Sequence, residues 1–349
     1  MGQANPSDKT DITVIGAGII GLSCAWELAK RGAKVSIFEK RWPPRGASWA
    51  AAGMLAPVSE AATEIGGHEC LFDLCMESAA LWPNFAADLE TASGIDLGYR
   101  SGPSLTIATS ADRLASFEAA SVALTRRNIP HKLLTEAEAR SLEPSLGPTI
   151  VGGLRYDIDG QIDNRAVMNA LIKACEKVGV KLASQPTPDG AATLETIGWQ
   201  ASDSRPVKGQ LMSLLPTTGG PRHVLNDRDL YIVPKADRIV IGATSEPGLS
   251  DNAVDISATD TLLRRAVSIV PALAEADILE RWAGIRPATD DRAPIMSAEN
   301  GSHYVATGHY RNGILLAPIT ARIMADMILE GRTSDLAAAF SPDRFAPAD

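Results

Sequence analysis

Three glycines near the start of the chain have the spacing of a dinucleotide-binding turn. Gly16, Gly18 and Gly21 stand in the segment GAGIIG. The first permits a tight turn, the second lets backbone approach a pyrophosphate, and the third lets a helix pack closely on a strand. Glu39 follows where an acid that binds a ribose hydroxyl belongs. The pattern predicts an FAD or NAD site rather than an NADP site, and a structural turn with a chance acid is the weaker alternative.

Two further segments carry residues that a cofactor or a substrate would need. The segment GASWAAAGMLAP (46–57) places small residues around Ser48, which would let backbone approach a flat cofactor, although composition alone fits a plain loop better. Arg286 stands in an apolar stretch, where its guanidinium could hold a carboxylate by two parallel hydrogen bonds. A surface ion pair with Asp290 or Asp291 is an equally good interpretation.

A third candidate segment lies near the end of the chain. GHYRNGILLAP (308–318) brackets His309, Tyr310 and Arg311 between two glycines and leads into an apolar helical pattern. A helix N-terminus aimed at a flavin would stabilise negative charge on the reduced ring. A core-packing helix explains the same pattern. Tyr231 and Tyr310 could reach a substrate, but tyrosines in strands more often pack, and for each histidine a structural role is the more common one.

Composition limits the classes of function. The 349 residues fit about two domains, and 33 Lys+Arg against 42 Asp+Glu give a net charge of −9, which argues against nucleic-acid binding. The four cysteines form no CxxC pair and no zinc-like cluster with histidine, so we expect no metal site and reduced thiols. We see no secretory signal and no apolar run long enough for a membrane span, which together favour a cytoplasmic protein.

The hydrophobic pattern predicts which elements position these residues. Residues 12–15, 22–30 and 35–38 form a strand, a helix and a strand, which is a βαβ unit. The order of the remaining elements is mixed and indicates an α/β (α+β) fold, in which a Rossmann-like domain is interleaved with an antiparallel sheet. Helices are expected at 70–91, 111–127, 135–142, 163–179, 258–270 and 314–330, and strands at 104–108, 150–156, within 210–244, and at 303–307.

Taken together, these motifs resemble a known family. GAGIIG with Glu39, GASWAAAGMLAP, DGQID, RPVKGQ, DLYIVP, AGIRPAT and GHYRNGILLAP occur in the order found in the glycine oxidase family, within the D-amino acid oxidase superfamily. The resemblance covers nearly the whole chain and implies FAD as cofactor. FAD should be noncovalent, because no cysteine follows Cys175. It also implies an FAD-binding domain at 8–83, 146–203 and 282–349, and a substrate-binding domain at 84–145 and 204–281.

The resemblance assigns roles to individual residues. The family's carboxylate-binding pair falls on Arg286 and Tyr231, and a second active-site arginine falls on Arg311. The substrate pocket is implied at Ser245, Met54 and His309. The FAD-binding positions fall on Gly16, Gly18, Ile19, Ile20, Gly21, Glu39, Lys40, Ser48, Ala51, Ala52, Gly53, Met54, Gly198, Arg286, Tyr310, Arg311, Asn312, Gly313 and Ile314.

The activity implied by the resemblance is oxidation of glycine, sarcosine or D-alanine by hydride transfer to FAD. Dioxygen would reoxidise the flavin and give hydrogen peroxide, and the product would serve thiamine thiazole synthesis. The resemblance also implies a homo-oligomer. The alternatives are a D-amino acid dehydrogenase with another acceptor, a vestigial flavin-fold protein, and an NAD-linked dehydrogenase, in which the segment GHYRNG would have no role.

One segment departs from the family pattern. Between residues 185 and 205 the family has a hairpin and an apolar strand whose backbone contacts the adenosine half of FAD. Here GWQASDS (198–204) resembles the tail of that motif, but no apolar strand precedes it. If the chain truly lacks this segment, a strand beneath the nucleotide would be lost, and with it part of the contact with FAD.

Overall fold

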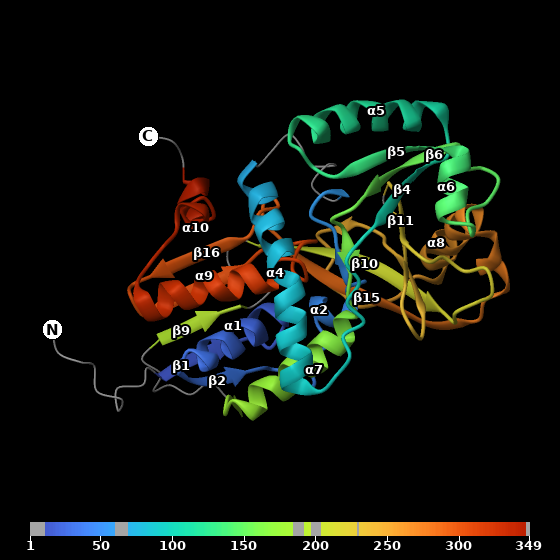
Figure 1. Ribbon diagram of the computed structural model, residues 1–349. Helices are drawn as coiled ribbons and strands as arrows, with labels where there is room; N and C mark the ends of the chain where they lie inside the picture. Colours follow the sequence, from blue (N-terminus) through green and yellow to red (C-terminus); the bar gives the residue numbers. More distant parts are fainter. Residues whose placement is uncertain (1–10, 60–68, 184–191, 197–203, 229, 347–349) are drawn as a thin grey trace.

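The computed structural model describes residues 11–59, 69–183, 192–196, 204–228 and 230–346. The described strands form two large sheets and one small pair, and helices cover the sheets (Figure 1). None of the helices in these ranges combines the length and the apolar character that crossing a bilayer requires. The predicted α/β fold, with a nucleotide-binding part interleaved with a largely antiparallel sheet, is confirmed.

The first sheet contains the predicted βαβ unit. Its strand order is β16-β17-β9-β1-β2-β8, with parallel pairing throughout except between β16 and β17. Ile12 and Val14 on one face of β1 and Thr13 on the other are buried, and β1 lies centrally, as expected of a parallel strand covered on both faces. The strands are β1 Asp11–Ile15, β2 Lys34–Phe38, β8 Lys181–Ala183, β9 Ala192–Glu195, β16 Ile295–Glu299 and β17 His303–Thr307.

Strand β9 answers the question whether the first sheet lacks a strand where the sequence shows no apolar run, because a strand is present there. The segment ATLE pairs in parallel with β1 on one side and with β17 on the other. Ala192 and Leu194 are buried, while Thr193 and Glu195 are half-buried. A four-residue strand with two polar positions does not read as apolar, which is why the sequence pattern missed it. Gly198, predicted to contact FAD, lies outside the described residues.

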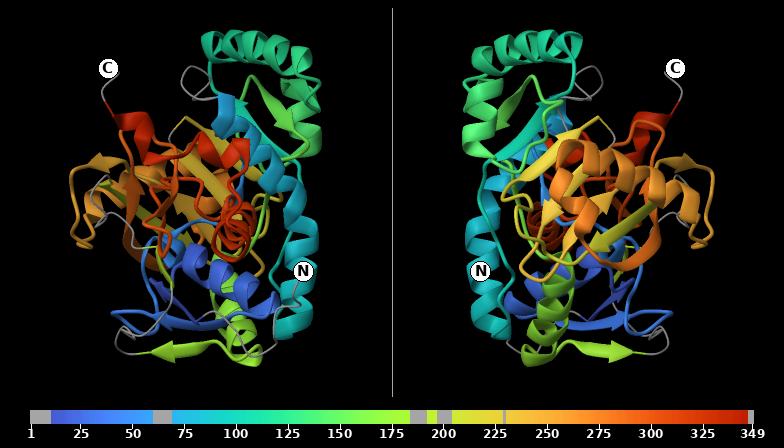
Figure 2. Two further views of the ribbon diagram at one scale, coloured as in Figure 1. Left: turned by 90° about the vertical axis from the view of Figure 1, so that its left-hand side faces the viewer. Right: turned by 90° about the vertical axis from the view of Figure 1, so that its right-hand side faces the viewer.

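Four helices pack around the first sheet. Helix α1 contacts both α7 and α9, and α4 contacts the same two helices. Figure 2 shows α4 running along one side of the molecule. Their shared core includes Leu22, Leu28, Leu171, Ile319 and Met324, each without measurable exposure. The helices are α1 Ile19–Lys30, α4 Glu69–Ser93, α7 Asn164–Lys177 and α9 Ala317–Glu330; the short α10 Asp335–Ala338 follows.

The second sheet is larger and mostly antiparallel. Its order is β14-β10-β13-β12-β11-β4-β6-β5, and β15 pairs with β10. Helix α8 packs on β10, β12 and β13, and α5 packs on β5 and β6. The strands are β4 Ser104–Ala108, β5 His131–Thr135, β6 Gly152–Tyr156, β10 Arg205–Leu214, β11 Val224–Asp227, β12 Leu230–Pro234, β13 Ile239–Gly242, β14 Glu246–Pro247 and β15 Ile278–Ala288. The helices are α5 Ala111–Arg126, α6 Glu136–Leu142 and α8 Ile256–Ile269.

The predicted domain boundaries differ from the sheets at two places. β6 lies in the predicted FAD-binding range 146–203 but pairs with β4 and β5 in the second sheet. β15 crosses the boundary between 281 and 282 and pairs with β10 along almost its whole length. Strand β15 was not predicted, because its residues, ILERWAGIRPA, do not alternate between apolar and polar, and most of them are half-buried in the fold.

Candidate active site

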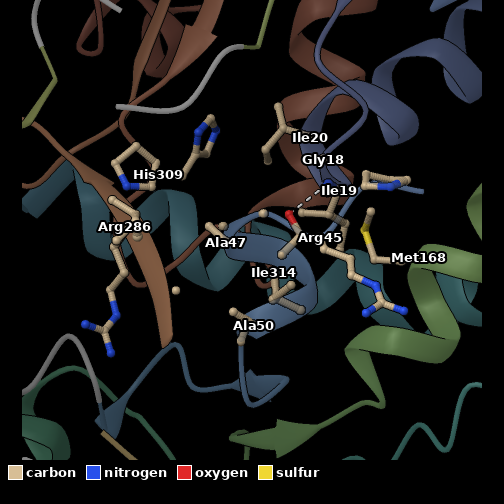
Figure 3. A pocket seen from close by; sticks show the side chains of 18 of the residues that line it. Gly18, Ile19, Ile20, Arg45, Ala47, Ala50, Met168, Arg286, His309 and Ile314 are labelled. Carbon is tan, nitrogen blue, oxygen red and sulfur yellow. Dashed lines mark hydrogen bonds between the residues drawn. The ribbon is translucent and has the colours of Figure 1, made fainter. Parts of the chain in front are cut away.

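A cavity of about 960 Å³ joins the two sheets. One end is formed by the turn before α1, the end of β2 and the short helix α2 (Ala47–Ala50). The other end is formed by β12, β15 and the loop that precedes α9. In Figure 3, Gly18 and Arg45 lie on the opposite side of the view from Arg286. The volume lies at the upper end of the range for ligand sites, so a dinucleotide and a small molecule are ligands of suitable size.

The glycine turn shapes the first end. Gly16 has a φ of +105°, and a Cβ there would lie 2.8 Å from Thr196 Oγ1. A Cβ at Gly21 would lie 1.9 Å from the Gly16 carbonyl oxygen, so only glycine lets α1 approach the turn. Gly18 is different, because a Cβ there would meet only Ser48 Oγ, at 3.3 Å. The absence of a side chain at Gly18 therefore opens the cavity rather than relieving a clash within the protein.

Backbone amides hold two polar side chains at this end. The Ile19 N–H, the first of α1, donates to Ser48 Oγ at 2.9 Å. The Ala17 N–H donates to Glu39 Oε2 at 2.9 Å, and the Arg41 N–H donates to the other carboxylate oxygen at 3.1 Å. Glu39 thus lies at the start of α1, in the position predicted for a ribose-binding acid, and its orientation is set by the chain around it.

Side chains from distant elements hold the short helix α2 against the cavity. Asn164 Nδ2 donates to the carbonyl oxygens of Ser48 and Trp49, at 2.8 and 3.0 Å. Trp282 Nε1 donates to the Ala50 carbonyl at 2.9 Å. Sequence reasoning missed Asn164 and Trp282 because neither stands in a recognisable motif. Together they position the segment that contains Ser48.

At the second end, two glycines make room for the predicted substrate-binding pair. A Cβ at Gly209 would lie 2.5 Å from either terminal nitrogen of Arg286, whose Nη1 donates to the Thr244 carbonyl at 3.3 Å. A Cβ at Gly242 would lie 2.6 Å from the Tyr231 hydroxyl oxygen. Arg286 and Tyr231 both line the cavity. Each side chain therefore extends along the face of the sheet across a position that has no side chain.

The alternative interpretation of Arg286 as a surface ion pair does not fit the structure. Asp290 pairs with Arg205 at 2.9 Å, and Asp291 pairs with Arg344 at 2.6 Å. Both acids thus have other partners, while Arg286 lines the cavity.

The loop before α9 is tied to the strand that bears Arg286. The Tyr310 N–H donates to the Pro287 carbonyl at 2.8 Å, and residue 309 bridges to residue 288. Arg311 lies over the Tyr310 ring, 5.4 Å from its centroid. The helix begins at Ala317, later than predicted, so residues 313 and 314 that line the cavity belong to the loop.

Most predicted site residues meet at this cavity. Gly21, Ser245 and Asn312 are not among the described residues that line it, and Ser245 is exposed. The lining residues that sequence reasoning missed include Thr196, Asn226 and Arg228, which no motif marks. The predicted residues that line the cavity are Gly16, Gly18, Ile19, Ile20, Glu39, Lys40, Ser48, Ala51, Ala52, Gly53, Met54, Tyr231, Arg286, His309, Tyr310, Arg311, Gly313 and Ile314.

The described lining of the cavity is strongly cationic. Its only carboxylate in these ranges is Glu39, although the chain as a whole carries a net charge of −9. Such a concentration of positive charge favours anionic ligands. The cationic side chains are Lys40, Arg41, Arg45, Arg228, Arg286 and Arg311.

His309 is a structural residue rather than an acid–base group. Its side chain is buried, and Nε2 lies 3.1 Å from Thr320 Oγ1 of α9. Burial lowers the pKa of His309 to about 3, so the ring is neutral at physiological pH. His309 borders the cavity, but its imidazole is hydrogen-bonded to Thr320 of α9.

We expect His309 to contribute to acid sensitivity. The unfolded chain binds a proton at His309 near its ordinary pKa of 6.5, whereas the folded chain does so only near 3. Stability is therefore lost as pH falls from 6.5 towards 3, by about 1.4 kcal/mol per pH unit, and is unaffected above 6.5. His309→Asn should show a smaller drop in melting temperature between pH 7 and pH 5 than the parent. His131→Asn is the control, because His131 is a half-buried histidine of β5 whose ring is hydrogen-bonded to Ser121 of α5. Equal drops in all three proteins would contradict this assignment.

The chain is similar to known proteins over nearly its whole length. The sequence profile of a family described as FAD dependent oxidoreductase (DAO) matches residues 11–327. The chain is 35% identical over 368 residues to the bifunctional protein ThiO/ThiG of Trichormus variabilis, covering 96% of this chain and 55% of that protein. It therefore spans about half the length of that relative. It is 33% identical over 375 residues to the glycine oxidase of Geobacillus kaustophilus, covering 96% and 97%.

The fold is shared with solved structures. The crystal structure of glycine oxidase from Geobacillus kaustophilus superimposes with a TM-score of 0.87 at 32% identity, covering 95% of this chain and 98% of that one. Glycine oxidase from Bacillus cereus ATCC 14579 gives a TM-score of 0.87 at 31% identity, with the same coverage.

Proposed function

Because this chain belongs to the DAO family of FAD-dependent oxidoreductases, we propose that it oxidises glycine or another small amino acid. The observation that carries this proposal is a single cavity that joins the glycine turn before α1 to the guanidinium of Arg286. One end suits an anionic dinucleotide, and the other suits a carboxylate. The similarity to proteins named glycine oxidase supports glycine as the substrate.

The residues at the first end fit FAD. Gly18 leaves the backbone open to the cavity, and the N-terminus of α1 provides amides and a positive dipole end for a pyrophosphate. Glu39 is placed for a ribose hydroxyl, and Lys40 and Arg45 add positive charge nearby. None of the four cysteines is among the described lining residues, which supports noncovalent binding. When bound, FAD supplies the hydride acceptor for the reaction.

At the second end, the chain binds and orients the amino acid. Arg286 holds the carboxylate by two parallel hydrogen bonds, and the Tyr231 hydroxyl donates a third. Fixing the carboxylate at one point also fixes the direction of the α-C–H bond, which lowers the entropic part of the barrier. A substrate that binds with a neutral amine needs no protein base, and neutral His309, bonded to Thr320, is not placed to act as one.

Dioxygen accepts the electrons and so completes the catalytic cycle. Two electrons and two protons leave the amino acid, dioxygen takes them up as hydrogen peroxide, and the imine is hydrolysed to a 2-oxo acid or passed on. Similarity to the ThiO/ThiG relatives supports a role in making the thiazole of thiamine. We also propose that the chain works as a homo-oligomer in the cytoplasm. Peroxide measured in air with glycine tests the oxidase proposal, and rapid dye reduction without peroxide would contradict it.

Gly209→Ala should weaken substrate binding without touching the substrate directly. The added Cβ would fall within 2.6 Å of three atoms of the Arg286 guanidinium, which must then move off the face of the sheet. Such overpacking costs about 1–3 kcal/mol, so we expect KM for glycine to rise roughly tenfold while FAD stays bound. Steady-state kinetics on the yellow protein measure this, and an unchanged KM would show that the carboxylate does not bind at the observed Arg286 position.

A further inference from the structure

We propose that the substrate end of the cavity binds a second carboxylate, and that Asn226 and Arg228 hold it. The preferred substrates are then small amino acids with two carboxylates, such as D-aspartate or iminodiacetate. This inference rests on the proposed function, since it concerns the amine that the same site oxidises. Nothing in the motifs of the sequence pointed to either residue.

Asn226 lies directly beside the predicted carboxylate-binding tyrosine. It is on β11, opposite Tyr231 of β12 in the antiparallel register, and directly opposed residues project from the same face of a sheet. Both residues line the cavity. Nδ2 of Asn226 is shielded from solvent and has no hydrogen-bond partner among the described residues. A buried donor without a partner destabilises the protein, and an acceptor on a ligand would remove that cost.

Arg228 adds a positive charge close to the Asn226 amide in sequence, and the two together suit an anion. It stands in the turn between β11 and β12, has a φ of +53°, and lines the cavity with an exposed side chain. Within the described ranges it makes no ion pair. Asp227 is adjacent in sequence, but the alternation of the strand turns its side chain to the opposite face, and it is not among the residues that line the cavity.

The charges at this end exceed what glycine needs. Three guanidiniums, those of Arg228, Arg286 and Arg311, line it, and the one carboxylate in the described lining, Glu39, belongs to the other end. Glycine brings a single carboxylate, which Arg286 holds in the proposed function. A second carboxylate on the same substrate would meet Arg228 and the unpartnered amide of Asn226. Ser250 and Asn252, which also line the cavity, are polar and uncharged.

The chemistry of the proposed reaction is unchanged by the second carboxylate. The α-carbon loses a hydride and the nitrogen a proton, which forms a C=N bond. Water then adds to that carbon and the C–N bond breaks. Iminodiacetate, dioxygen and water thus give glyoxylate, glycine and hydrogen peroxide, with dioxygen accepting the two electrons and two protons. The glycine released is itself a substrate of the proposed function.

Two pairs of substrates test the inference, because the members of each pair differ only by one carboxylate. Sarcosine is compared with iminodiacetate, and D-alanine with D-aspartate, using kcat/KM from peroxide formation. We expect the parent protein to prefer the dicarboxylate in at least one pair. Arg228→Met should lower that preference about tenfold, as the loss of one charge-assisted hydrogen bond implies, and chiefly through KM. Asn226→Asp, which keeps the shape but adds a negative charge, should lower it at least as much.

Arg264→Met is the matched control, since Arg264 is exposed on α8 and does not line the cavity. Its substrate preference should equal that of the parent. The inference is overturned if the parent prefers the monocarboxylate in both pairs, or if Arg228→Met and Asn226→Asp keep the parent's preference while retaining FAD. If the yellow parent oxidises none of the four amines and not glycine, the proposed function itself has failed. If the parent oxidises glycine but shows no preference for dicarboxylates, this inference is overturned and the proposed function stands.

Discussion

Arg286→Ala should raise KM for glycine about 100- to 1000-fold while the protein keeps its FAD. The substitution removes the guanidinium that lies over Gly209 and leaves the substrate carboxylate without its main partner. Removing one partner of a desolvated, hydrogen-bonded charge pair costs about 2–5 kcal/mol. Steady-state kinetics with glycine measure the effect. The flavin absorption of the variant shows whether the cofactor end is intact.

Two comparisons separate this role from a general loss of charge. Arg286→Lys keeps one positive charge but cannot form two parallel hydrogen bonds, so it should recover only part of the lost affinity. Arg205→Ala removes an arginine near the same strand end, whose side chain is largely exposed and paired with Asp290, and should behave like the parent. Similar KM values for the parent and Arg286→Ala would rule out the assigned carboxylate site.

Gly18→Ala should weaken FAD binding about 10- to 100-fold without unfolding the protein. The backbone at Gly18 has φ −68° and ψ 177°, which alanine adopts freely, and its Cβ would meet only Ser48 Oγ at 3.3 Å. The methyl group would therefore occupy cavity space beside the N-terminus of α1, where the pyrophosphate is expected. Overpacking costs about 1–3 kcal/mol, and a cost in the middle of this range corresponds to the expected loss of FAD affinity. Titration of the apoprotein with FAD, followed by fluorescence, measures the affinity.

Gly21→Ala provides the contrast. A Cβ there would lie 1.9 Å from the Gly16 carbonyl oxygen, so α1 cannot keep its place against the turn. We expect a lower melting temperature even for the apoprotein, whereas Gly18→Ala should melt like the parent apoprotein. If Gly18→Ala binds FAD with parental affinity, the cofactor does not approach the backbone at this glycine.

The first βαβ unit was predictable because its determinants are local. Glycine spacing, helical periodicity and an acid at the end of a strand all stand within thirty residues, and each constrains the backbone directly. Strand β9 was not predictable from the same signals. Its four residues, ATLE, are half polar, and their place between β1 and β17 depends on pairing with strands far away in the sequence.

The site was predictable to the extent that it is built from motifs. Arg286 and Tyr231 stand in recognisable segments, and the structure brings both to one cavity. Asn164 and Trp282, which hold α2, and Asn226, which lies beside Tyr231, carry no sequence signal. Their roles come from tertiary contacts between distant elements. Ser245, which the family resemblance places in the substrate pocket, is exposed and is not among the described residues that line the cavity.

The most direct test is the visible absorption spectrum of the purified protein, recorded without oxygen before and after glycine is added. We predict a yellow protein whose flavin band is bleached by glycine and returns when air is admitted, with formation of hydrogen peroxide. A colourless protein that takes up no FAD, or a yellow one that neither glycine, sarcosine, D-alanine nor a dicarboxylic amine can bleach, would contradict the account.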